Sequence, residues 1–216
     1  MSLRVLTALE ARVLAVLVEK QFTVPDSYPL SVNALTLGCN QKTARDPVMN
    51  ASESEVLRAL DELRGMNLVN RVSGSRVDRY EHNFRSGINV PGQAEALLAT
   101  LMLRGPQTAA ELRANSERLH RFADISSVEA FLAELAEREP PLALKLARAP
   151  GARESRWAHL LCGEPAEGLV AAAAAGEAPA RDDEILQLRA EQARLAAELE
   201  TLKAQLAQIR SELGLA

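Results

Sequence analysis

The apolar residues of the first 85 positions recur at the spacing of three amphipathic helices, followed by two short strands. Each helical segment begins near a Ser or Thr and keeps Leu, Val or Ala on one face, and the two strand-like runs flank a Ser-Gly-Ser turn. The pattern predicts helices over residues 8–20, 31–37 and 52–66, and a β-hairpin made from residues 68–72 and 77–84.

Polar residues and glycines mark several helix ends. Thr7 is followed three positions later by Glu10, the spacing of a capping box in which the two side chains satisfy free backbone N–H groups. Thr108 and Glu111 repeat that spacing farther along the chain. Gly38 follows the second helical pattern and is predicted to end that helix, because glycine readily adopts the conformation that helix ends require.

The same order of segments then occurs a second time. The second set is predicted as a helix over 95–103, a helix from Thr108, a helix from Ser126 or Ser127 to about Arg138, and a hairpin from 142–148 and 156–161. The two hairpins match at a constant offset of 77 residues, where Gly74, Arg76, Arg79, Tyr80 and His82 correspond to Gly151, Arg153, Arg156, Trp157 and His159. We interpret the two segments as copies of one module.

Three helices followed by a two-stranded wing are typical of the winged-helix variant of the helix-turn-helix. The predicted fold class is therefore mainly α (α+β): two tandem winged-helix domains, residues 1–85 and 86–163, each with its own core beneath a short β-ribbon.

The last part of the chain has a different pattern. Small residues predict a linker over 164–181, and heptads predict a coiled-coil helix over 182–214. The core positions are Ile185, Leu188, Gln192, Leu195, Leu199, Leu202, Leu206, Ile209 and Leu213. The flanking charges favour a parallel homodimer, and the alternative is a single helix folded back on the winged helices.

Charge is unevenly distributed along the chain. Residues 1–85 carry 11 basic and 10 acidic side chains, residues 86–162 carry 9 of each, and residues 163–216 carry 5 basic and 10 acidic ones. A dedicated nucleic-acid module usually has a basic excess, and neither predicted domain has one.

The two cysteines, Cys39 and Cys162, match neither a disulfide framework nor a metal-ligand spacing, which favours a reducing compartment. The chain has no apolar run of the roughly 20 residues that a membrane span needs, and no signal-peptide pattern. We expect a cytoplasmic protein with no membrane partner.

Motifs for catalysis are absent from the sequence: there is no phosphate-binding glycine loop, nucleophile elbow, zinc-protease helix or paired-cysteine motif. His82 and His159 each share a strand face with an aromatic residue and are expected to be packing residues. We expect no enzyme activity, no cofactor and no metal.

Candidate nucleic-acid contacts lie in one loop and two hairpins. They are Asn40, Gln41, Lys42 and Arg45 of the loop, Arg71, Arg76 and Arg79 of the first hairpin, and Arg153 and Arg156 of the second. The alternative is structural: Asn40 caps a helix, Arg45 pairs with Asp46 or Asp26, and the hairpin arginines pair with nearby carboxylates. The third helices argue against simple duplex reading, because their acidic residues would meet phosphate repulsion.

Several stretches carry a family resemblance. The runs TVPDSYPLSVNALTLGCNQKTARDPVM, RVDRYEH and ARAPGARESRWAHLL resemble the YceH family of uncharacterised bacterial proteins, over residues from about Leu6 to Cys162. The resemblance implies tandem winged-helix domains and no established activity.

Two hypotheses follow for function. The first is a DNA-binding or transcription-associated protein that contacts phosphates with the hairpin arginines and the loop. The second is a protein-interaction scaffold whose winged helices dock a partner, for which acidic third helices carry no penalty.

Overall fold

The computed structural model describes residues 4–72, 77–148 and 152–165, which all belong to one compact unit. Within these residues the chain is a mixed α/β protein with seven α-helices, one short 3-10 helix and two small antiparallel sheets. The predicted coiled-coil helix over 182–214, with its dimerisation residues, lies outside the described residues, as does most of the predicted linker.

The first half of this unit contains three helices and a hairpin. Its helices are α1 (Ala8–Thr23), α2 (Val32–Cys39) and α3 (Glu53–Gly65), with a 3-10 turn, η1 (Pro25–Ser27), after α1. The hairpin strands are β2 (Val69–Val72) and β3 (Arg79–His82), and a two-residue strand, β1 (Leu30–Ser31), completes a sheet of order β1-β3-β2. Leu30 pairs with Tyr80 across β1 and β3.

The second half repeats this order after a short helix, α4 (Phe84–Ile88). Its helices are α5 (Gly92–Arg104), α6 (Ala109–Asn115) and α7 (Ile125–Ala136), and its strands are β4 (Ala143–Lys145) and β5 (Trp157–His159). A β-bridge joins Gln107 to Trp157, at positions 77 residues after the Leu30–Tyr80 pair. In each half, therefore, a residue that lies just before the second helix pairs with the hairpin.

Local capping explains where most of the helices begin. Capping boxes open α1 (Thr7 and Glu10), α3 (Ser52 and Glu55) and α6 (Thr108 and Glu111), and Ser31 caps α2. The spacing of residue types alone predicts the boxes at Thr7 and Thr108, because a capping box needs only neighbours three positions apart, and the box at Ser52 is an addition from the structure.

Several predicted helix boundaries are wrong. Helix α1 runs to Thr23 beyond its predicted end at 20, and α5 begins at Gly92 before its predicted start at 95. The third helix of the second half begins after Asp124, whose carboxylate accepts from the backbone N–H of Ser127, and not at Ser126 or Ser127. Gly38 lies inside α2 and does not end it. A Cβ at Gly38 would lie 2.6 Å from Cγ1 of Val16 in α1, so the glycine allows the two helices to approach closely.

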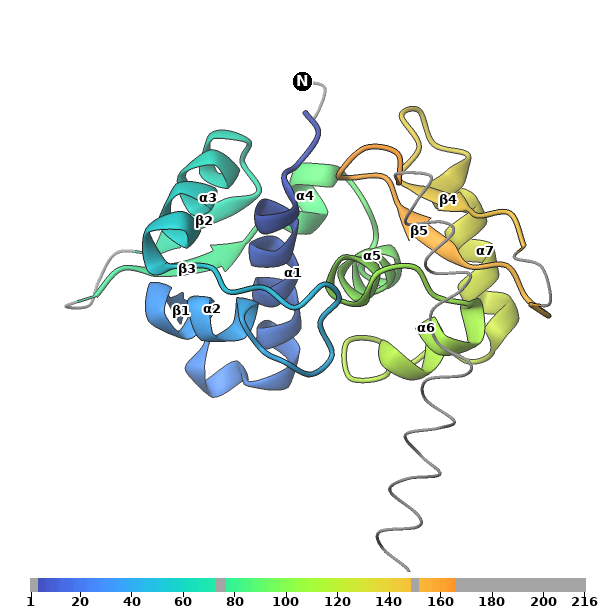
Figure 1. Ribbon diagram of the computed structural model, residues 1–216, viewed down its shortest axis with the longest axis horizontal. Coiled ribbons are helices and arrows are strands. Elements are labelled where there is room, and N and C mark those ends of the chain that lie inside the picture. The colour runs from blue at the N-terminus through green and yellow to red at the C-terminus, as the bar shows by residue number, and fades with distance from the viewer. Residues whose placement is uncertain (1–3, 73–76, 149–151, 166–216) are drawn as a thin grey trace, which may run out of the picture. The chain divides into compact units, whose positions relative to one another are not determined.

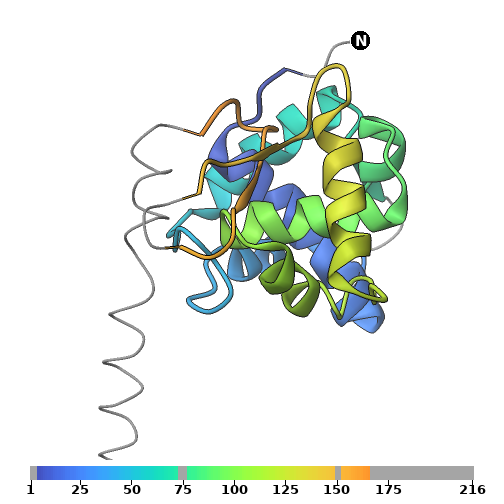
Figure 2. The same ribbon diagram turned by 90° about the vertical axis from the view of Figure 1, so that its right-hand side faces the viewer.

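The hydrophobic core is continuous across both halves, which corrects the expectation of a separate core in each. One cluster of buried residues includes Leu14 and Leu17 of α1 together with Leu97, Leu98 and Leu101 of α5. Figure 1 shows α1 and α5 next to each other at the centre, flanked by the remaining elements of each half. In Figure 2 the elements of the second half, α5, α6, α7 and its hairpin, face the viewer.

The two halves are also joined through their backbones. The N–H of Leu6, just before α1, donates to the carbonyl of Leu161, just after β5, at 2.8 Å. The N–H of Asp46 donates to the carbonyl of Leu103 at the end of α5, also at 2.8 Å. None of the helices in the described ranges is long and apolar enough to cross a bilayer.

Candidate nucleic-acid interface

The loop after α2 is held from beneath by buried arginines. Arg12 of α1 is 1% exposed and donates to the carbonyls of Cys39 (3.2 Å) and Pro47 (2.8 Å). Asn40 closes the same loop, because its side chain donates to and accepts from the backbone of Ala51, both at 2.8 Å. Side chains therefore hold the loop at both ends, and they hydrogen-bond backbone groups that would otherwise have no partner.

Arg45 points inward from this loop. Its side chain is 0% exposed and its Nη2 lies 2.6 Å from Oε2 of Glu19, in α1. The guanidinium also donates to the carbonyls of Gly38 (3.1 Å) and Ala44 (2.8 Å) and to the side chain of Gln41 (2.6 Å). Every direction of the guanidinium fork thus meets a protein acceptor, and the partner of Arg45 is Glu19 instead of Asp46 or Asp26.

Glu19 remains ionised in this setting although it is largely buried. Burial alone would raise the pKa of its carboxyl, but the hydrogen bond and charge of Arg45, with the nearby Lys20, outweigh burial and lower the pKa. Of the four candidate residues of the loop, Lys42 alone is exposed, while Asn40 and Gln41 are half-buried.

The first hairpin uses its described arginines within the fold. Arg71 pairs with Asp78 at 2.8 Å, and both side chains are nearly half exposed. Arg79 donates through Nη1 to the carbonyls of Ser27 (3.3 Å) and Pro29 (2.7 Å), which ties β3 to the segment that leads into α2. Arg76 lies outside the described residues.

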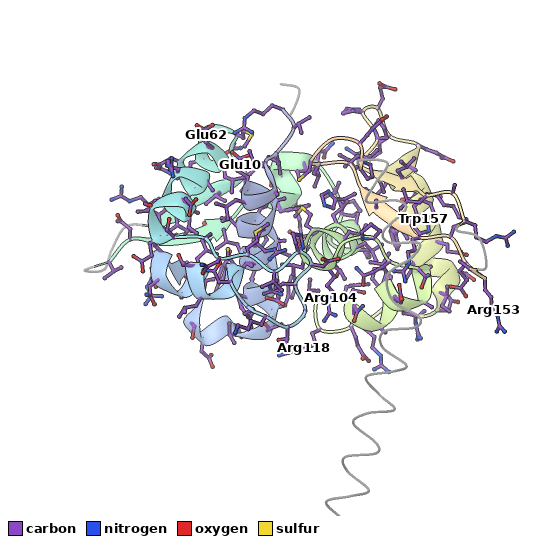
Figure 3. All side chains as sticks on the ribbon, viewed as in Figure 1. Glu10, Glu62, Arg104, Arg118, Arg153 and Trp157 are labelled. Carbon is purple, nitrogen blue, oxygen red and sulfur yellow. The ribbon has the colours of Figure 1, made fainter. Side chains whose placement is uncertain are left out.

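The second hairpin uses Arg156 in the same way. Its Nη1 donates to the carbonyl of Pro106 at 2.9 Å and lies 3.1 Å from Oε2 of Glu111, the capping-box glutamate of α6. Pro106 stands 77 positions after Pro29, as Arg156 does after Arg79, so the two contacts are equivalent. Arg153 is exposed, and Figure 3 shows it at the outer edge of the second hairpin, away from the centre of the fold.

The third helices expose acidic side chains. Helix α3 carries four carboxylates and two arginines, of which Glu62 binds Arg4 (3.0 Å) and Arg64 binds Asp61 (3.2 Å). Helix α7 has Glu129 and Glu134 on its exposed surface and no Lys or Arg in its sequence. A helix of this composition repels a phosphate backbone wherever it approaches one.

One polar cluster was not singled out by its sequence pattern. Glu95 of α5 is 0% exposed, and its Oε2 accepts from Nε of Arg85 at 2.6 Å while its Oε1 lies 3.4 Å from Nδ1 of His82. Burial, followed by the charge of Arg85, lowers the pKa of His82 to about 4. Burial raises the pKa of Glu95, opposed by Arg85. The sequence signal that could have found it is the likeness of the run EARVLAVL, which begins at Glu10, to EALLATLM, which begins at Glu95. Glu10 likewise binds an arginine, Arg4, at 2.8 Å.

The described part of the chain holds no group of three or more His, Cys, Asp or Glu side chains with the arrangement of a metal site. Cys39 is buried, and burial raises the pKa of its thiol to about 12.

Comparison with known proteins identifies the family. A family model described as "Protein of unknown function, DUF480" matches residues 6–152. A UPF0502 protein of Leptothrix cholodnii is 61% identical over 214 residues, which cover 98% of this chain and 96% of the relative. This chain belongs to the YceH (UPF0502) family of uncharacterised proteins.

Other relatives in the YceH family match almost as fully. A UPF0502 protein of Methylibium petroleiphilum is 67% identical over 199 residues, covering 92% of this chain and 85% of the relative. A UPF0502 protein of Burkholderia pseudomallei is 61% identical over 214 residues, covering 99% and 92% of the two chains. The resemblance noted in the sequence is thereby confirmed at the level of the family.

Proposed function

We propose that this chain is a non-enzymatic, cytoplasmic protein-interaction scaffold, built from two tandem winged-helix modules and dimerised through its C-terminal heptads. The observation that carries the proposal is the surface of α7. This helix has the position of the helix that enters the DNA major groove in winged-helix proteins, yet it has carboxylates and no Lys or Arg. A partner surface rich in Lys and Arg complements that surface, whereas a phosphate backbone does not.

The repeated order of elements supports the winged-helix assignment. In each half, three helices precede an antiparallel hairpin, and a residue before the second helix pairs with the aromatic residue of the hairpin. The equivalent contacts of Arg79 and Arg156 extend the match from the backbone to side chains.

Exposed apolar side chains on both third helices favour a protein partner. Leu57 of α3 is 40% exposed, and Ile125 at the start of α7 is 44% exposed. Large apolar groups ringed by charge are common in protein interfaces, where their burial adds to the electrostatic attraction.

A salt series with duplex DNA tests the proposal against DNA binding. The full chain is titrated into a labelled random-sequence 20-base-pair duplex at about 50 mM and 200 mM salt, and anisotropy is recorded. A protein that grips several phosphates loses about three orders of magnitude or more in affinity over that range. We expect no such steep dependence; tight, salt-sensitive binding would contradict the scaffold proposal.

A lysine decapeptide tests the surface directly. Amide chemical shifts of the full chain are followed as the peptide is added, and the changes should concentrate on α7 and α3. The double charge reversal of Glu129 and Glu134 to Lys should abolish the changes on α7, while the reversal of the exposed Glu117 and Glu164 should leave them intact. Changes spread evenly over the surface would count against a docking face.

DNA binding is the second candidate, and exposure of two cations favours it. Lys42 and Arg153 both lie on the surface, in the loop and the hairpin where phosphate contacts were predicted. In the salt series above, Lys42→Ala and Arg153→Ala would then weaken binding to any sequence and reduce its salt dependence.

A further inference from the structure

A recess opens where the last turns of α1 and α5 approach each other. Its volume is about 240 Å³, and its wall includes four basic side chains from four separate segments: Lys20 of α1, Arg45 after α2, Arg104 of α5 and Arg118 after α6. Figure 3 shows Arg104 and Arg118 at the same end of the unit. Each half contributes the end of its first helix and the loop after its second helix.

The wall carries more positive than negative charge. Glu19 is the one carboxylate among the described residues that line it, and it is shared by Arg45 at 2.6 Å and Lys20 at 3.3 Å. The C-terminal ends of α1 and α5 add a partial charge of about −0.5 each. The four basic side chains together carry more charge than Glu19 and the helix ends that face the recess.

Some polar groups of the recess can act as hydrogen-bond donors toward it. Gln41 accepts from both Arg45 (2.6 Å) and Lys20 (3.3 Å) through Oε1, which leaves its NH₂ group as the donor end. Thr43 adds a hydroxyl to the lining, whereas the hydroxyl of Thr23 already donates to the carbonyl of Glu19 at 2.9 Å. Arg118 is exposed at the margin of the recess. The side chain of Arg45 is fully buried and held by protein acceptors. Its positive charge is therefore fixed in place next to the recess.

We propose that this recess binds a small phosphorylated anion. Arginine, lysine and hydroxyl donors match the oxygens of a phosphoryl group, and fixed cations in a recess attract anions more strongly than the same cations on an open surface. The volume is below the range of about 300 to 1,000 Å³ that is usual for drug-sized ligands, so it suits a phosphoryl group with a small organic part. A rigid duplex does not enter a recess of this size.

This site is independent of the scaffold function and of the surface of α7. It joins the two halves at the ends of their first helices, so a bound anion stabilises their contact in addition to the shared core.

Phosphate titration of the full chain tests the site. Calorimetry and thermal unfolding are carried out with sodium phosphate and with sodium chloride at matched ionic strength. We expect saturable heat and a rise in Tm with phosphate only. Arg118→Ala should weaken phosphate binding about tenfold, which corresponds to about 1.4 kcal/mol. Arg121→Ala, an exposed arginine that does not line the recess, is the matched control and should bind as the wild type does.

Lys20→Ala gives a second variant that alters the recess from the opposite half, and circular dichroism verifies that each variant is folded. Equal effects of phosphate and chloride, or equal binding by Arg118→Ala and Arg121→Ala, would overturn the proposal. Binding of a 12-base-pair duplex that depends on Arg118, without binding of inorganic phosphate, would also overturn it, because the ligand would then be a nucleic-acid backbone.

Discussion

Arg79 and Arg156 make equivalent contacts: each donates through Nη1 to the carbonyl of a proline 50 positions earlier, Pro29 at 2.7 Å and Pro106 at 2.9 Å. Both prolines lie shortly before the second helix of their half, so each arginine fastens a hairpin to the segment that begins that helix. These two arginines, which the sequence suggested as phosphate contacts, therefore have the same structural role in both halves.

Substitution of these arginines should affect stability more than binding. Arg79→Met and Arg156→Met should each lower the free energy of unfolding by about 1 to 2 kcal/mol, because a charged donor to a carbonyl is lost. Urea denaturation measures the change, and the exposed Arg121→Met is the control. Wild-type stability in either variant would contradict the structural role of that arginine.

The buried pair of Arg45 and Glu19 should be strongly coupled. Arg45→Met leaves the carboxylate of Glu19 desolvated without its main partner, and we expect a loss of about 3 kcal/mol. The double variant with Glu19→Gln should lose less than the sum of the two single variants. Because the pKa of Glu19 is lowered from 4.5 in the fold, its contribution is present above pH 4.5 and is lost as the pH falls below it.

Arg71→Met provides the surface comparison for that pair. Arg71 and Asp78 are both nearly half exposed, so their separation should cost less than about 1 kcal/mol. Similar losses for Arg45→Met and Arg71→Met would show that burial of Arg45 adds nothing.

His159 should make stability depend on pH. Burial lowers its pKa from 6.5 to about 4, so the unfolded chain takes up a proton more readily than the folded chain between these values. Stability should therefore fall by about 3 kcal/mol from this residue as the pH is lowered from 6.5 to 4. His159→Phe should flatten the pH dependence of Tm relative to the wild type.

The continuous core predicts one unfolding transition for both halves. Leu14→Ala, in α1 of the first half, should cost about 2 to 5 kcal/mol because Leu14 is fully buried. The single tryptophan, Trp157, lies in the second half, so its fluorescence should report the same shift in urea midpoint. Leu57→Ala is the control, because Leu57 is 40% exposed and its loss should change the urea midpoint little. An unchanged midpoint for Leu14→Ala would mean that the halves unfold independently.

The heptads predict the oligomeric state. Removal of the residues after Ala180 should convert a dimer to a monomer, because the apolar core positions from Ile185 to Leu213 would be lost. Light scattering of the two chains measures this, and one mass for both would contradict the coiled-coil prediction.

Local patterns predicted the elements well because their causes are local. The capping boxes at Thr7 and Thr108 depend on residues three positions apart, and the helices follow from their apolar faces. Strand β1 and helix α4 were not predicted, since a two-residue strand exists only through its partner and a five-residue helix has little periodicity.

Burial of charge could not be predicted in the same way. Arg45 and Lys42 stand three positions apart in one polar loop, yet the first is enclosed and the second is exposed. The difference arises from Glu19, which lies 26 positions away from Arg45 in sequence and meets it only after α1 and the loop have packed together. The shared core of α1 and α5 was missed for the same reason, because amphipathic periodicity shows that a face is buried and not which element covers it.

The hydrogen bond from Leu6 to Leu161 places the entry and exit of the folded unit side by side. A short linker between these two points would close the unit into a ring, and new ends could then be cut elsewhere on its surface. The exposed turn at Asp124, between α6 and α7, is such a place, so a circularly permuted chain opened there should keep both hairpins and the common core.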